Sequence, residues 1–194
     1  MKSVAVFCGA QTGKNQAFVD AAQAMGELVA TKGLTLVYGG GNIGLMGVLA
    51  DAALARGGKV VGVIPHFMKD RELAHPGLTE LILVKTMHER KAIMAERSDG
   101  FLAMPGGFGT LDELCEILTW SQIGLHNKPI GILNTLGYFD SLLSFFDDAV
   151  EHGLLPEKLR AILLEAPSPD KLLQLLASHE HIKGTEATGS LAQA

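Results

Sequence analysis

The chain contains little cysteine and no excess of positive charge, and each deficit excludes classes of protein. Its two cysteines, Cys8 and Cys115, form neither a CxxC pair nor a zinc spacing, and His88 has no ligand spacing around it. We therefore expect no metal site and no secreted disulfide scaffold, and the reducing cytoplasm is the expected location. Sixteen Lys and Arg against 21 Asp and Glu give a net charge of −5, which disfavours nucleic acid as a partner.

The chain also lacks a hydrophobic run suited to a membrane. The one uncharged run of sufficient length, residues 33–50, contains six glycines and Asn42, a poor composition for a membrane helix. Residues 4–8 resemble the start of a signal peptide, but Gly9, Gln11 and Lys14 interrupt the apolar run too early. We expect no membrane partner, and residues 4–8 are predicted to form a strand.

The length of 194 residues predicts one domain. A chain of this mass buries about 70% of the surface that its unfolded form exposes, enough for a hydrophobic core. We assign residues 1–182 to a single domain. Residues 183–194, in which small and polar residues lack periodicity, are expected to form a flexible tail.

Short apolar segments alternate with amphipathic helical segments along the chain. Strands are predicted at residues 4–8, 34–38, 59–64, 80–84, 101–104, 128–133 and, at an edge, 161–164. Helices are predicted at residues 15–32, 45–56, 87–97, 111–118 and 142–150 and from residue 168 onward. This alternation predicts an α/β, Rossmann-like doubly wound fold, with a mainly parallel sheet and helices on both faces.

Glycine supplies 23 of the 194 residues and is concentrated in three turns, each directly after a predicted strand. These turns are residues 9–15 (GAQTGKN), 39–44 (GGGNIG) and 105–109 (PGGFG). The carboxyl ends of parallel strands meet at one edge of a sheet, where such folds bind ligands. We therefore expect the three turns to converge on a pocket.

The first two turns are loose matches to nucleotide-binding motifs. Residues 39–44 match GxGxxG, but they follow the second strand, and no acid for a ribose hydroxyl follows about 20 residues later, so NAD binding is disfavoured. Residues 9–15 resemble a P-loop that is one residue short and has Asn15 where magnesium coordination requires Ser or Thr. A tight turn leading into a helix explains these glycines equally well.

The third turn continues as PGGFGTLDE, residues 105–113, and is more specific. Backbone N–H groups around Gly106, Gly107 and Gly109 can contact phosphate oxygens, and the positive end of a helix dipole favours an anion. A capping box formed by Thr110 and Glu113 is an alternative that needs no ligand. That alternative does not explain three glycines.

Four segments together resemble the LOG (Lonely Guy) family: PGGFGTLDE, YGGGNIGLMG at 38–47, MHERK at 87–91 and TWSQIGLHNKP at 119–129. The likeness extends from about residue 4 to about residue 155. It implies a phosphoribohydrolase that releases free cytokinin from its riboside 5′-monophosphate, without a cofactor, commonly as a homodimer. Lysine decarboxylase activity finds no support, because no pyridoxal phosphate site is recognisable.

The resemblance also implies roles for individual residues. Arg90 and Glu113 match the catalytic pair. The matching substrate-binding residues are Glu72, Lys91, Gly106, Gly107, Phe108, Gly109, Thr110, Leu111, Asp112 and Thr119, together with Gly40 and Gly41 of the second turn. Relatives commonly have Cys-Gly-Ser-Ser and a tyrosine where this chain has Cys8-Gly9-Ala10-Gln11 and Phe18, which leaves the contacts of the first turn open.

The chemistry that these residues would perform is hydrolysis of an N-glycosidic bond through a positively charged, oxocarbenium-like state. Glu113 would stabilise that charge or activate water, and Arg90 would anchor the substrate. From spacing alone, Arg90, Lys91 and Glu113 are ordinary solvated charges, and only the resemblance favours a site. A nucleotide-binding module without catalysis is the alternative function. The preferred base, adenine or an N6-prenylated adenine, stays open.

Overall fold

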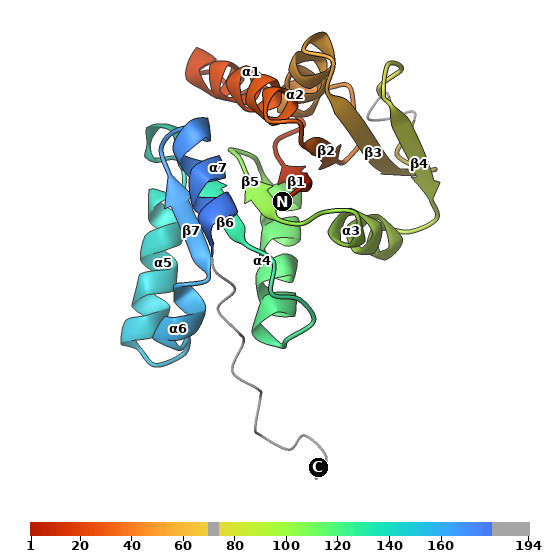
Figure 1. Ribbon diagram of the computed structural model, residues 1–194. Coiled ribbons are helices and arrows are strands. Elements are labelled where there is room, and N and C mark those ends of the chain that lie inside the picture. Colours follow the sequence, from red (N-terminus) through yellow and green to blue (C-terminus); the bar gives the residue numbers. More distant parts are fainter. Residues whose placement is uncertain (70–73, 180–194) are drawn as a thin grey trace.

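The computed structural model describes residues 1–69 and 74–179, in which seven strands form one sheet (Figure 1). The strands are β1 (Ser3–Phe7), β2 (Thr35–Tyr38), β3 (Lys59–Pro65), β4 (Glu80–Val84), β5 (Phe101–Ala103), β6 (Ile130–Leu133) and β7 (Leu163–Ala166). Their order across the sheet is β4-β3-β2-β1-β5-β6-β7, and each neighbouring pair is parallel. The predicted α/β fold with a parallel sheet is confirmed.

Helices cover both faces of this sheet (Figure 1). They are α1 (Gln16–Thr31), α2 (Gly44–Ala55), α3 (Met87–Glu96), α4 (Phe108–Gln122), α5 (Asp140–Glu151), α6 (Glu157–Arg160) and α7 (Pro169–Ser178). Side chains of α1, α2 and α7 pack in one hydrophobic cluster, and those of α3, α4 and α5 pack in another. The sheet separates the two clusters, as the doubly wound prediction requires.

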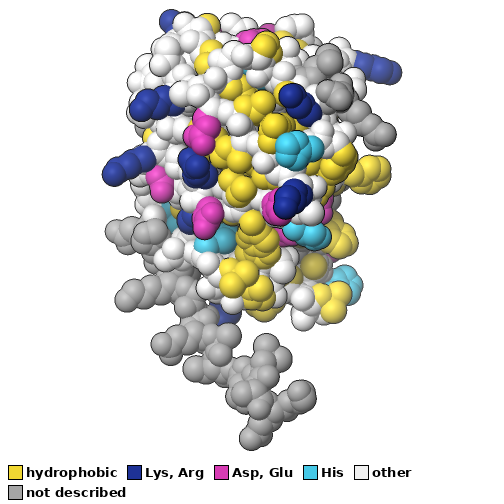
Figure 2. Space-filling model, turned by 90° about the vertical axis from the view of Figure 1, so that its right-hand side faces the viewer, with side chains coloured by type: hydrophobic (Ala, Val, Ile, Leu, Met, Phe, Trp, Pro, Cys, Tyr) yellow, Lys and Arg dark blue, Asp and Glu magenta, His cyan; other side chains and the backbone are white. Residues whose placement is uncertain are grey.

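The face that carries β4 and α3 mixes charged and hydrophobic side chains (Figure 2). Lys and Arg are interspersed there with Asp and Glu. Arg97, the C-cap of α3, pairs with Glu80, the first residue of β4, at 3.3 Å. Part of the hydrophobic surface comes from the edge strand, where Leu81 and Leu83 are exposed. Opposite charges that lie so close together offset each other, unlike the basic patch of a nucleic-acid-binding face.

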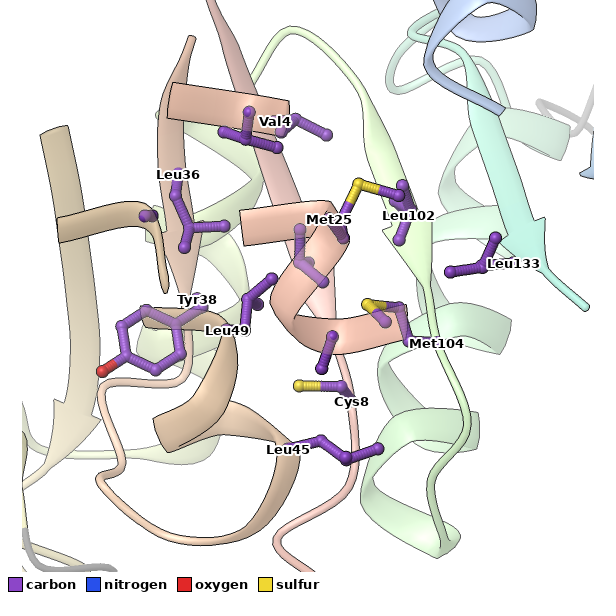
Figure 3. Close-up of a cluster of buried hydrophobic side chains, with 14 of the residues drawn as sticks. Val4, Cys8, Met25, Leu36, Tyr38, Leu45, Leu49, Leu102, Met104 and Leu133 are labelled. Carbon is purple, nitrogen blue, oxygen red and sulfur yellow. The ribbon is translucent and has the colours of Figure 1, made fainter. Parts of the chain in front are cut away.

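Alternation along the strands explains the two clusters. Val4 and Val6 of β1 point to the side of α1 and α2, whereas Ala5 and Phe7 point to the opposite side. Figure 3 shows the first cluster, in which Val4 lies near side chains of α1, α2 and the neighbouring strands. Because both of their faces are buried, the inner strands β1, β2, β5 and β6 are almost entirely apolar, whereas the edge strands β4 and β7 carry exposed residues.

The strand order reverses at β1, which has β2 on one side and β5 on the other. Val6 pairs with Tyr38 of β2 and with Leu102 of β5, so the three strands end at nearly the same level. Backbone hydrogen bonds then join the turns, from Gly9 N to the Pro105 carbonyl at 3.1 Å and from Leu45 N to the Gly9 carbonyl at 3.0 Å. The predicted convergence of the turns is confirmed.

Some predicted boundaries were wrong. The edge strand lies at Leu163–Ala166 and not at 161–164, because α6, which the sequence analysis missed, includes residues 157–160 and ends with Ala161 as its C-cap. A short 3-10 helix, η1 (Thr135–Gly137), was also missed. The predicted tail, residues 183–194, and Glu72 lie outside the described residues. Within residues 1–69 and 74–179, no helix has both the length and the hydropathy needed to cross a bilayer.

Candidate active site

The first and third turns border a cavity of about 510 Å³, a volume typical of small-molecule sites, and the second turn reaches it only through Leu45 and Met46, which follow it directly. Its wall combines the turn after β1, the turn after β5 and the start of α4 with one or two residues from each of five other segments. The lining residues are Cys8, Gly9, Ala10, Gln11, Thr12, Gly13, Phe18, Leu45, Met46, Met68, Met87, Arg90, Pro105, Gly106, Gly107, Gly109, Thr110, Glu113 and Tyr138. The cavity thus lies at the point where the strand order reverses.

The wall formed by the third turn presents the N-terminus of α4. This helix begins at Phe108, with Gly107 as its N-cap and without a hydrogen bond from a capping side chain. The capping-box alternative was therefore wrong, because Thr110 lies within the first turn of the helix and is buried. A Cβ on Gly106 would overlap the Thr110 hydroxyl, which explains why glycine precedes the N-cap. Backbone amides at this helix end suit an anion.

Arg90 reaches the cavity from α3 and is only 4% exposed. Its Nη2 donates to the carbonyl of Gly39 at 2.9 Å, and its Nη1 lies 3.8 Å from the sulfurs of Met68 and Met87. A Cβ on Gly39 would overlap Nη2, so glycine is required at this position for the guanidinium to approach. The first glycine of the second turn therefore contributes to the site through Arg90.

The other two glycines of that turn lie outside the lining. Gly40 and Gly41 are buried; the Gly40 carbonyl accepts from the backbone N–H of His75 at 3.0 Å, and Gly41 forms a bridge with Ala74. His75 in turn donates from Nε2 to Asp51 at 3.0 Å, because its Nδ1 accepts from the Gly77 N–H. In the structure, these glycines hold the segment after residue 73 and do not face the cavity.

Glu113 lies one turn into α4 and lines the same cavity as Arg90. Cys8, at the end of β1, is part of this wall and is buried next to Leu45 (Figure 3). Burial raises the pKa of the Cys8 thiol far above its ordinary range, and the negative charge of Glu113 raises it further. The thiol therefore stays neutral at physiological pH, so it cannot act as a thiolate nucleophile.

Lys91, the neighbour of Arg90, points to α4 and not into the cavity. Its Nζ lies 3.0 Å from Oδ2 of Asp112 and 3.0 Å from Oε2 of Glu116. Burial on its own would lower the pKa of Lys91, but hydrogen bonds and charge attraction from the two carboxylates together raise it. Lys91 therefore stays charged and ties α3 to the first two turns of α4.

Three further residues named by the resemblance lie outside the cavity lining. Phe108 is 94% exposed. Leu111 packs against the hydrophobic cluster formed by α3, α4 and α5. Thr119 is exposed and donates from Oγ1 to the Cys115 carbonyl at 2.7 Å. The structure thus brings Arg90 and Glu113 to one cavity with Gly106, Gly107, Gly109 and Thr110, and it leaves the other named residues that it describes outside the cavity lining.

Several lining residues were missed by the sequence analysis. Met87, the first residue of the MHERK segment, contacts Arg90 and borders the cavity. Tyr138 lies 32 residues after Gly106 and packs edge to face against Phe18, with ring centroids 5.4 Å apart. Its position shortly after β6 was a signal that the sequence offered, because the loop after β6 lies at the same edge of the sheet as the turns.

Among the described residues, the cavity lacks the side chains that would hold a metal ion or pyridoxal phosphate. Residues 1–69 and 74–179 contain no cluster of three or more His, Cys, Asp or Glu side chains suited to a metal ion. Among these described residues, no lysine lines the cavity, whereas a pyridoxal phosphate enzyme needs a lysine there for its Schiff base. The polar lining consists instead of amides, one guanidinium, one carboxylate and hydroxyl groups.

Solved structures share this fold. The molybdenum cofactor binding protein from Rippkaea orientalis superposes with a TM-score of 0.69 at 24% identity, covering 92% of this chain and 97% of that chain. The molybdenum cofactor carrier protein MCP from Chlamydomonas reinhardtii gives 0.66 at 22% identity, covering 90% and 98%. At this level of identity, the likeness shows the fold alone.

Sequence comparison is more specific. A family model described as possible lysine decarboxylase matches residues 46–176. Cytokinin riboside 5′-monophosphate phosphoribohydrolase LOG5 of Arabidopsis thaliana is 45% identical over 181 residues, 93% of this chain and 79% of that protein. LOG1 of the same plant is 46% identical over 178 residues, 92% of this chain and 84% of that protein. By these matches, the chain belongs to the family described as possible lysine decarboxylase and, within it, to the LOG proteins.

Proposed function

We propose that this protein hydrolyses the N-glycosidic bond of adenosine 5′-monophosphate or an N6-modified derivative of it. The products are the free base and ribose 5-phosphate. One observation carries the proposal: Arg90 and Glu113, from different helices, line one cavity together with the amides at the start of α4. The names of the related LOG proteins support the same reaction.

The N-terminus of α4 holds the 5′-phosphate in this proposal. Gly107 and Gly109 line the cavity and carry no side chain that would keep an anion from the backbone. The helix dipole adds an attraction of typically 0.3 to 1 kcal/mol, and more in a partly buried site. A phosphate bound here places the attached ribose beside Glu113, which lies four residues after Gly109.

The reaction adds water across the bond between C1′ of the ribose and the base nitrogen. As that bond breaks, positive charge develops on the ribose ring, and the electron pair of the bond goes to the base. The carboxylate of Glu113 stabilises the charge and accepts a proton from the attacking water, whose oxygen bonds to C1′. That proton then passes to the departing base, so the base leaves neutral and Glu113 returns to its carboxylate form. A positioned general base of this kind contributes roughly 10² to 10⁴ in rate.

Arg90 anchors the substrate and offsets the negative charge that develops on the leaving base. Because its Nη2 is fixed on Gly39 and its stem is buried, the guanidinium is pre-oriented before the substrate binds. Such pre-organisation lowers the cost of ordering the complex. Lys91 and Asp112 act indirectly, because their ion pair joins the helices that carry Arg90 and Glu113. Glu72 stays a proposed substrate contact.

A product assay tests the proposal. The purified protein is incubated with AMP and with isopentenyladenosine 5′-monophosphate, and free adenine and free isopentenyladenine are measured by chromatography. Release of either base supports the proposed reaction, and comparison of the two rates identifies the preferred base. Absence of both bases, with nucleotide binding present by calorimetry, would instead favour the alternative of a non-catalytic nucleotide-binding module.

We also propose a homodimer and a cytoplasmic location. Exposed apolar side chains on and near α4 and α5 support self-association: Ile123 is 59%, Phe145 63% and Leu154 84% exposed. Light scattering coupled to size-exclusion chromatography measures the mass in solution, and a monomer at micromolar concentration would contradict the dimer. The location rests on the scarcity of cysteine, and cell fractionation tests it.

A further inference from the structure

Tyr138 touches the third turn through its hydroxyl group. It follows η1 at the carboxyl end of β6 and lines the cavity, and its side chain is about half exposed. Its Oη donates to the carbonyl of Gly106 at 2.7 Å, the usual length of a well-formed O–H···O hydrogen bond. This bond crosses from the loop after β6 to the turn after β5, over 32 residues of sequence.

The loop after β6 is built to hold this tyrosine in place. Asn134 donates from Nδ2 to Asp140 at 2.7 Å and accepts from the backbone N–H of Phe139 at 2.8 Å, so both ends of the loop are joined. Leu136, with φ of 56°, adopts a left-handed conformation that L residues rarely take. The ring of Tyr138 then packs edge to face on the buried Phe139, with centroids 5.0 Å apart.

The carbonyl that Tyr138 holds belongs to the same peptide unit as the N–H of Gly107. In a trans peptide unit these two groups point in opposite directions, so fixing one fixes the other. Both flanking residues are glycines, whose backbone adopts many conformations, and α4 has no side-chain cap at this end. Loss of the hydroxyl group of Tyr138 would therefore make rotation of this peptide unit easier.

We propose that Tyr138 is a positioning residue, which through Gly106 keeps the Gly107 N–H directed at the bound phosphate. This inference deepens the proposed function, because it rests on the 5′-phosphate lying at the start of α4. The aromatic ring and the hydroxyl have separate tasks: the ring packs against Phe18 and Phe139, and the hydroxyl orients the amide.

The test compares the parent with Tyr138→Phe, which keeps the ring and removes the hydroxyl. The loss of one hydrogen bond that orders the site should weaken phosphate binding roughly threefold to tenfold. Inorganic phosphate is the probe, titrated by calorimetry and by the amide resonances of ¹⁵N-labelled glycine. The Gly107 resonance should shift with phosphate in the parent and shift less, or at higher concentration, in the variant.

Tyr38→Phe is the matched control, because Tyr38 also donates its hydroxyl to a glycine carbonyl, that of Gly41 at 3.1 Å, outside the cavity lining. We expect phosphate affinity in this control to stay within about twofold of the parent. Kinetically, Tyr138→Phe should raise KM for AMP more than it lowers kcat. Adenosine, which lacks the phosphate, should bind parent and variant equally.

The outcomes separate this inference from the proposed function. Equal phosphate affinity and equal Gly107 shifts in the parent and Tyr138→Phe would overturn the role of Tyr138, even if the parent hydrolyses AMP. Weaker phosphate binding in that variant would support the role, even if the parent hydrolyses no nucleotide. If the Gly107 amide resonance of the parent does not shift when phosphate is added, both the positioning role and the phosphate site on which it rests are overturned.

Discussion

Lys91 Nζ lies 3.0 Å from Oδ2 of Asp112, so an ion pair joins α3 to the helix that carries Glu113. Arg90 and Lys91 are consecutive in the helix, and consecutive side chains point about 100° apart. This geometry lets Arg90 enter the cavity while Lys91 contacts α4. The MHERK segment thus supplies one side chain to the ligand site and one to the support of that site.

Replacing Lys91 by methionine should destabilise the protein. The largely buried Glu116 would lose its charged partner, and we expect a loss of about 1 to 3 kcal/mol in the free energy of unfolding. Because the folded pKa of Lys91 is raised, its stabilisation is present below the ordinary lysine pKa of about 10.4 and is lost as pH rises further. Urea unfolding of parent and variant as a function of pH measures both effects.

Arg97→Met is the control for this experiment. Arg97 caps the end of the same helix and pairs with Glu80, but both side chains are about half exposed. An exposed ion pair contributes about 0 to 1 kcal/mol, so this variant should lose less stability than Lys91→Met. Equal losses in the two variants would contradict the special role of the Lys91 ion pair.

Replacing Glu113 by glutamine should abolish most turnover but preserve binding. The amide keeps the size of the side chain but cannot accept a proton from water, so we expect kcat to fall roughly 10²- to 10⁴-fold. The dissociation constant for AMP, measured by calorimetry, should change much less. The control is Glu116→Gln, one turn further along α4 and outside the cavity lining. A similar loss of kcat in both variants would contradict the assignment of Glu113.

Replacing Gly39 by alanine should act through Arg90. The added methyl group would overlap Nη2 and crowd Met46, displacing the guanidinium from its position on the Gly39 carbonyl. A displacement of about 1 Å in a positioning group costs on the order of 10²-fold in rate, and we expect a loss of that size in kcat/KM. In the Arg90→Ala background, the same glycine substitution should have little further effect. Additive losses would show that Gly39 acts independently of Arg90.

The buried thiol of Cys8 should make the protein less stable at alkaline pH. Its pKa is raised in the folded state, so the folded protein holds the proton where the unfolded chain releases it, above about pH 8.5. The free energy of unfolding should then fall by about 1.4 kcal/mol per pH unit from this group. Cys8→Ala should flatten that slope.

Cys115→Ala provides the comparison for the alkaline slope. Burial and then the charge of Asp112 also raise the pKa of Cys115, but this side chain is exposed, so its removal should alter the slope less. If Cys8→Ala and the parent lose stability equally between about pH 8.5 and about pH 10, the account of the buried thiol is wrong.

Hydrophobic periodicity and the composition of the turns predicted the longer helices and strands correctly, because a buried segment must be apolar and the turn that follows it must not be. Apolar runs such as β1 and β2 are covered on both faces, and the glycine turns follow them directly. The parallel sheet then places these turns at one edge, so the cavity could be predicted before any side chain was placed. The short elements α6 and η1 were missed because four or fewer residues carry too little periodicity.

The details of the site depended on where α4 begins and on the directions in which side chains point, and the spacing of residues in the sequence determines neither. Thr110 fits a capping box in sequence, yet α4 starts two residues before it with glycine as the N-cap. Lys91 follows Arg90 in a shared motif, and only the packing of α3 on α4 shows that it points elsewhere. Tyr138 contacts Gly106 across another strand and helix, a long-range pairing that no local pattern contains.

A crystal structure of Glu113→Gln with AMP bound is the most direct test of the central claim, because the slow variant should retain its substrate. The account predicts the phosphate oxygens within hydrogen-bonding distance of the amides at the start of α4, and the ribose against the side chain at position 113. A phosphate seated on Arg90, with the base rather than the sugar next to position 113, would contradict it.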